Sequence, residues 1–162
     1  MITLFMPDSS PADALAPLMA HITETLRRVE RIEYEFASGE QPPDPFELQL
    51  WFGDRLVRLR GAGDGERLEV HTVAWQDPFG DAAENERLVL SGRVVCRNVS
   101  SDPGYADIVG TALLGVKPRL EPADRLTGVS LQFAANVLHV HIEFDEFFVT
   151  WGGTMPPLGS EF

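Results

Sequence analysis

Apolar and polar residues alternate over most of the chain between Phe46 and Trp151, and short turn sequences interrupt the alternation at intervals. Successive side chains of a β-strand point to opposite faces, so this pattern is typical of antiparallel strands with one buried and one solvated face. The chain is therefore predicted to be rich in hairpins. Its 162 residues are enough to bury one hydrophobic core without disulfides or metals.

The alternation predicts a three-stranded meander followed by further strands. Turns are expected at Gly53-Asp54, between residues 61 and 65, and near residues 134–136. Residues 105–116 fit both a helix and a strand, and a short helical turn followed by a strand is expected there. The predicted strands span residues 46–52, 55–60, 68–75, 87–99, 128–133 and 137–151.

The phase of the alternation also predicts which side chains are buried. In the strand at residues 87–99, the arginines occupy one face, and the face expected to point into the core carries Leu88, Leu90, Val94 and Cys96. In residues 137–151, the apolar face carries Leu138, Val140, Ile142 and Phe144.

The N-terminal part of the chain predicts one helix that leads into a strand. Ser10 can cap a helix that begins at Pro11, and Asp13 is favourable in its first turn. Apolar residues then recur at spacings of three and four, at Leu15, Leu18, Met19, Ile22, Leu26 and Val29. The following strand is expected to bury Ile32, Tyr34 and Phe36 and to expose Glu33 and Glu35.

These elements indicate an α+β fold, in which the N-terminal helix packs on a mostly antiparallel, meander-rich sheet. The sheet is expected to be either a partly closed barrel or two related hairpin units. The second alternative rests on one constant sequence offset, which relates Leu50, Phe52, Val57 and Leu59 to Leu131, Phe133, Leu138 and Val140. We expect a single domain over residues 1–151 and a weakly ordered tail over residues 152–162.

The charge of the chain restricts its partners. The formal net charge is −12 and Lys117 is the only lysine, so nucleic acids and anionic membranes are unfavourable partners. The same charge favours a basic protein partner, although ordinary solubility also explains it. No apolar run is long enough to cross a bilayer, and residues 1–6 do not resemble a secretion signal. The lone Cys96 suits a reducing compartment, so a cytoplasmic location is expected.

The sequence contains none of the common catalytic or phosphate-binding motifs, so no catalytic residue and no cofactor are expected. The alternative is a metal site on one strand, because His139, His141 and Glu143 occupy alternate positions that project from one face. His71 is a candidate further ligand. An amphipathic strand with a polar outer face explains the same pattern without a metal. His21 is expected to be a partly exposed surface residue.

The loop from Gln76 to Glu86 is the first candidate for a partner-binding surface. It is expected to carry an aromatic residue among acids at an exposed tip, and exposed loops often carry function. The candidate contact residues are Asp77, Phe79, Asp81, Glu84 and Glu86. The alternative is that Phe79 folds back onto the core.

The C-terminal half of the chain contains four short motifs: Gly110-x4-Gly-Val, Gly128-Val-Ser-Leu-Gln-Phe133, Leu138-His-Val-His-Ile142 and Asp145-Glu-Phe-Phe-Val149. With these motifs it resembles small, uncharacterised bacterial domains of the toxin-immunity type. The resemblance covers residues 105–151, and residues 46–75 in part. It implies no catalytic residue.

The resemblance, the acidity and the missing motifs together predict a non-enzymatic interaction protein of the immunity type, which occludes a basic toxin or another basic protein. A small metal-dependent enzyme or ligand-binding barrel that uses His139, His141 and Glu143 is the main alternative. An acidic secretion chaperone is a third interpretation, which the strand-like C-terminal region disfavours.

Overall fold

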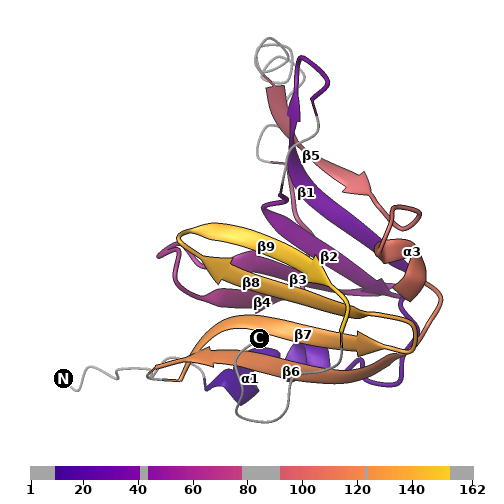
Figure 1. Ribbon diagram of the computed structural model, residues 1–162, viewed down its shortest axis with the longest axis vertical. Coiled ribbons are helices and arrows are strands. Elements are labelled where there is room, and N and C mark those ends of the chain that lie inside the picture. The colour runs from indigo at the N-terminus through magenta and orange to yellow at the C-terminus, as the bar shows by residue number, and fades with distance from the viewer. Residues whose placement is uncertain (1–9, 41–43, 78–91, 123, 154–162) are drawn as a thin grey trace.

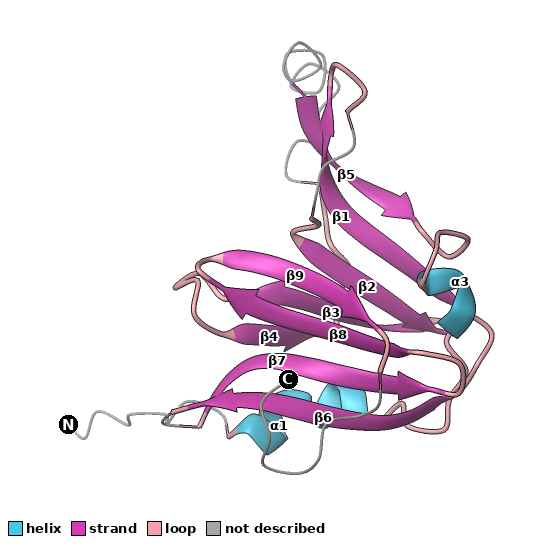
Figure 2. Cartoon of the chain, viewed as in Figure 1, coloured by secondary structure: helices cyan, strands magenta, loops and turns pink. Residues whose placement is uncertain are grey.

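Two antiparallel sheets form the protein in a computed structural model that describes residues 10–40, 44–77, 92–122 and 124–153 (Figures 1 and 2). The first sheet has the order β4-β3-β2-β1-β5 and the second the order β6-β7-β8-β9. The helices described are α1 (Pro11–Met19) and the short α3 (Tyr105–Ile108). The strands are β1 (Arg28–Phe36), β2 (Glu47–Phe52), β3 (Arg55–Gly61), β4 (Leu68–His71), β5 (Gly92–Asn98), β6 (Leu113–Glu121), β7 (Arg125–Phe133), β8 (Val137–Glu143) and β9 (Glu146–Trp151).

One hydrophobic core lies between the two sheets, and α1 adds Leu15 and Leu18 to it. The predicted combination of an N-terminal helix with antiparallel meanders is therefore confirmed in outline. The predicted partly closed barrel is wrong, because the strands form two open sheets. After β5 the chain passes through α3 and begins a new sheet at β6. The segment before β1 is hydrogen-bonded to the segment before β6 around an antiparallel bridge between Thr25 and Ala112.

The predicted N-terminal helix is too long. α1 ends at Met19, the chain then turns, and Thr23 has a φ of 80° that no helix accommodates. Leu26 and Val29 are fully buried as expected, but Val29 belongs to β1 and the Leu26 amide donates to the Thr111 carbonyl. The apolar spacing indicated burial correctly but not the secondary structure.

The predicted meander is confirmed as β2, β3 and β4, and the last four strands, β6 to β9, form a second meander. The β2–β3 hairpin and the β7–β8 hairpin pair in the same register at the constant sequence offset. Leu50 pairs with Val57 as Leu131 pairs with Leu138. Leu48 likewise pairs with Leu59, as Val129 pairs with Val140. The two hairpin units are therefore alike in geometry.

Residues 137–151 are two strands rather than one continuous strand region. A turn at Phe144-Asp145 separates β8 from β9, and both residues have positive φ, 52° and 64°. Phe144 was predicted to face the core, but it is 91% exposed at the tip of this hairpin. Neither residue is a glycine or asparagine, so the usual sequence signal for such a turn is missing here.

The predicted phases of β5 and β1 are partly wrong. Cys96 is exposed, and it pairs with Ile32 on the face of the first sheet that points away from the core. Glu33 was expected to be solvated, but it is buried because Arg31 and Arg97 form ion pairs with it. Pairing with β1 sets the phase of β5, so Arg97 turns inward to Glu33 and Cys96 turns outward. Leu88 and Leu90 lie outside the described residues.

No helix in the described ranges has the length and apolar character needed to cross a membrane.

Cys96 is expected to react with a thiol reagent in the native protein, but slowly. Burial of its sulfur and the neighbouring Glu30 carboxylate raise the pKa of the thiol to about 11. The labelling rate should therefore rise about tenfold per pH unit from pH 7 to pH 10, because only the thiolate reacts. Stopped-flow or mass-spectrometric labelling of native and urea-unfolded protein measures this. Labelling that requires unfolding would show that the assigned phase of β5 is wrong.

Candidate functional site

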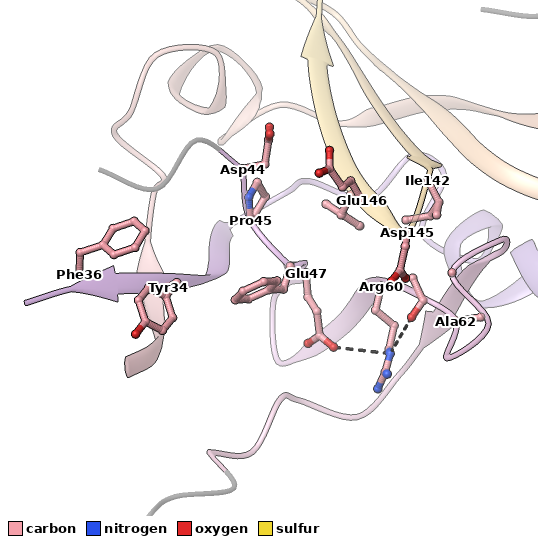
Figure 3. Close-up of a pocket in the computed structure, with 14 residues that line it drawn as sticks. Tyr34, Phe36, Asp44, Pro45, Glu47, Arg60, Ala62, Ile142, Asp145 and Glu146 are labelled. Atoms are coloured by element: carbon pink, nitrogen blue, oxygen red, sulfur yellow. Dashed lines mark hydrogen bonds and ion pairs between the residues drawn. The ribbon is translucent and has the colours of Figure 1, made fainter. Parts of the chain in front are cut away.

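A groove of about 680 Å³ with an apolar inner surface lies beside the β8–β9 hairpin (Figure 3). It exists because β1 runs beyond β2. β2 pairs with β1 only from Arg28 to Ile32, so no strand of the described ranges pairs with the last part of β1 on that side. Residues 44–46 pass through this position, and the Phe46 amide donates to the Ile32 carbonyl at 2.7 Å. We call this hollow the groove.

Aromatic and aliphatic side chains form the inner surface of the groove. Tyr34 and Phe36 of β1 lie edge to face, with ring centroids 4.8 Å apart. Phe46 is 51% exposed, and Ile142 and Phe147 reach the groove from the β8–β9 hairpin. An apolar surface of this kind, open to solvent, is typical of the central part of a binding site.

The rim of the groove is acidic. Asp44, Glu47, Asp145 and Glu146 line it, and Arg60 is the one cation among the described residues that line it (Figure 3). The Glu47 carboxylate is neutralised, because Arg58 and Arg60 lie 3.3 and 3.6 Å from it.

The other three carboxylates of the rim, those of Asp44, Asp145 and Glu146, form no hydrogen bond or ion pair with another described residue. The rim therefore carries uncompensated negative charge.

The tip of the β8–β9 hairpin concentrates unfavourable features next to the groove. Phe144 and Asp145 each hold a positive φ without being glycine, which costs about 1–2 kcal/mol per residue. Glu143 and Glu146 are directly opposed across the hairpin, and like charges so placed repel. Gly65 packs against the turn so closely that an added Cβ would lie 2.5 Å from the Asp145 carboxylate. The exposed Phe144 ring is thus surrounded by acids on a turn that its neighbours fix in place.

The loop predicted to bind a partner falls mostly outside the described residues. Phe79, Asp81, Glu84 and Glu86 lie in that undescribed part, so their role stays a prediction. Asp77 is described and exposed, and it lines a small hollow beside Arg93 and Cys96 on the first sheet. This hollow is separate from the groove, so the structure does not bring Asp77 to the groove rim.

The strand that carries the alternative metal ligands has the predicted phase. His139, His141 and Glu143 are less buried than the leucine, valine and isoleucine between them. However, both ring nitrogens of His139 have protein partners: Nδ1 lies 2.6 Å from Ser130 Oγ and Nε2 lies 2.9 Å from the Gly152 carbonyl oxygen. His141 stacks on Phe148 instead, with Glu143 at 3.6 Å. Among the described residues, no three His, Cys, Asp or Glu side chains gather as metal ligands would.

The other two histidines are not part of such a cluster. His71 contacts Glu69, with 2.8 Å between the His71 Nε2 atom and the carboxylate. His21 was predicted to be partly exposed, but it is 4% exposed and stacks on Phe52 with centroids 4.4 Å apart. The turns after α1 fold it inward, which its helical spacing did not indicate.

The sequence did not point to the groove, because its residues come from five separate segments. One local signal was present in Glu143-Phe144-Asp145-Glu146, where an aromatic residue stands among three acids and the strict alternation ends. That combination is unusual for the middle of a strand and is compatible with an exposed turn. Phe46, which follows Pro45, gave no comparable signal.

The fold and the groove define the protein as a small two-sheet antiparallel domain with an acid-rimmed apolar groove. No family model, curated protein or solved structure matches the chain. The function must therefore be inferred from the groove itself.

The like-charge pair at the hairpin tip gives a stability prediction. Glu146→Lys should raise the free energy of unfolding by about 0.5 kcal/mol, because the new lysine faces Glu143 across the hairpin. Glu121→Lys is the matched control, since Glu121 already faces Arg125 and the same change should destabilise there. Urea denaturation measures both. A loss of stability in Glu146→Lys similar to that in Glu121→Lys would contradict the assigned pairing.

Proposed function

We propose that this protein is a non-enzymatic interaction protein whose groove binds a basic segment of a protein partner. The observation that carries the proposal is the uncompensated acidic rim around an apolar, aromatic surface. Apolar centres with polar rims are typical of protein interfaces, and aromatic residues at such centres contribute much of the binding energy. The partner segment would place an apolar side chain in the groove and basic side chains against its rim.

The charge of the whole chain supports a basic partner. At a net charge of −12 the protein attracts a basic surface over a distance of about one Debye length, roughly 8 Å at physiological ionic strength. Such attraction raises the association rate and disfavours acidic partners. A toxin domain with a basic active surface is one partner of this kind, and the resemblance to immunity-type domains supports that choice.

Phe144 is proposed to be the main anchor. Phe144→Ala should raise the dissociation rate of the partner about tenfold or more, which corresponds to ~2 kcal/mol for an anchor residue. The fold should hardly change, because the ring is 91% exposed. Leu114→Ala is the matched control, since Leu114 is 54% exposed at the opposite end of the second sheet. Affinity purification identifies the partner, and surface plasmon resonance measures the rates.

The rim acids should act on the association rate instead. Asp44→Asn combined with Glu146→Gln should slow association and flatten its salt dependence, because these carboxylates attract the partner before contact. Asp54→Asn is the matched control, because it removes the same charge in the exposed β2–β3 turn, outside the groove. If the partner's kinetics were unchanged in Phe144→Ala and in the rim variant, the groove would not be its binding site.

The loop from Gln76 to Glu86 and the groove can be compared directly as binding sites for the partner. Phe79→Ala should leave the dissociation rate of the partner unchanged if the groove is the binding site. The same kinetic measurement decides between them. A faster dissociation in Phe79→Ala, with none in Phe144→Ala, would assign the partner to the loop from Gln76 to Glu86.

A further inference from the structure

A second, smaller hollow lies directly beside the groove, with the Asp44-Pro45 segment lining both. Its volume is about 190 Å³, and its walls include Arg31, Asp44, Asp102, Tyr105, Val149 and Trp151. We call it the tyrosine hollow. These residues come from β1, from the loop before β2, from the start of α3 and from β9, so the fold of both sheets is needed to form it.

Tyr105 is held rigidly in the wall of this hollow. Its ring packs edge to face on Trp151, with centroids 4.8 Å apart. Gly104 has a φ of 83°, and an added Cβ there would lie 2.5 Å from the Trp151 ring, so only glycine lets the loop approach this closely. Tyr105 is 3% exposed, yet its buried hydroxyl has no hydrogen-bond partner within the described part of the chain. A buried polar group in this state requires an explanation.

Arg31 supplies further unused donors. Its Nε atom lies 3.1 Å from the Glu33 carboxylate, which fixes the side chain. Its Nε atom makes no hydrogen bond of acceptable geometry within the described part of the chain. The guanidinium also lies near the Tyr105 hydroxyl, which likewise has no partner of acceptable geometry there, and burial raises the pKa of that phenol, so it remains an O–H donor. A planar guanidinium beside a hydroxyl donor suits a carboxylate.

The two carboxylates of the tyrosine hollow differ in whether they already have a partner among the described residues. Asp102 is neutralised by Arg97 at 2.9 Å. The exposed Asp44 carboxylate has no partner among the described residues, so it is free to bind an ammonium group. The unused groups of the hollow are therefore donors for a carboxylate and an acceptor for an ammonium. Val149 and Trp151 provide an apolar wall between them.

We propose that the tyrosine hollow binds a free α-amino acid with a small apolar side chain. Arg31 and Tyr105 hold the carboxylate, Asp44 holds the ammonium group, and the side chain lies against Val149 and Trp151. This site needs no protein partner, although it shares Asp44 with the rim of the groove. A simple carboxylate anion has no ammonium group to bind Asp44. A simple amine has no carboxylate to bind Arg31 and Tyr105.

Titration of the full-length ¹⁵N-labelled protein with L-alanine, followed by NMR, tests the proposal. The Trp151 indole and Tyr105 amide signals should shift saturably, with a dissociation constant in the millimolar range, about −4 kcal/mol. Propionate and ethylamine should bind at least about tenfold more weakly, since each loses one of the two charge-assisted contacts. Absence of saturable shifts up to about 50 mM L-alanine, or equal binding of propionate, would overturn the proposal.

Two variants assign the contacts. Tyr105→Phe keeps the ring on Trp151 and removes only the hydroxyl, and Asp44→Asn removes only the charge. Each should weaken L-alanine binding at least about fivefold, as expected for one lost hydrogen bond to a charged group. Asp54→Asn should bind L-alanine as the unaltered protein does. L-Alanine binding that is equal in all three variants would place the amino acid elsewhere and refute the assignment, whatever the groove binds.

Discussion

The length of β1 is the constraint on which the groove and the tyrosine hollow depend. β1 has nine residues, but it pairs with β2 only as far as Ile32, and its remaining residues pair with β5 alone. Figure 1 shows β1 and β5 continuing past the other strands of their sheet. The Asp44-Pro45 segment takes the place that β2 leaves open. It lines both the groove and the tyrosine hollow, so this one segment contributes to the walls of both.

The part of β1 that extends beyond β2 also explains a buried ionic network. On the inner face of β1, Arg31 and Glu33 follow the core residue Val29, where the hydrophobic core ends. A carboxylate buried there alone would be strongly destabilising, and the ion pairs with Arg31 and Arg97 offset that cost. Arg97 can reach Glu33 only if β5 turns its arginine face inward. The network therefore determines the phase of β5 and leaves Cys96 outside.

The sequence predicted the positions of the strands better than the tertiary contacts of individual side chains. Alternation located the two meanders, because each has a buried face that requires apolar residues at every second position. Alternation failed where a polar residue has a buried partner, as for Glu33, or where a turn lacks glycine, as at Phe144. It also could not separate one sheet from two, since each sheet has the same internal pattern. The groove and the tyrosine hollow escaped prediction because their residues meet only through tertiary packing.

The β8–β9 turn differs from the β2–β3 turn in a way that bears on function. In the β2–β3 turn Gly53 adopts a φ of 78° with little strain, whereas Phe144 and Asp145 adopt positive φ values with a Cβ. The hairpin tip adds two opposed glutamates and a fully exposed aromatic ring, and none of these features contributes to the core. Backbone strain that brings no packing advantage is common at functional sites. All three costs fall within a few residues of the groove, so the local stability lost at this tip supports the proposal that Phe144 and the acids next to it in the sequence contact a partner.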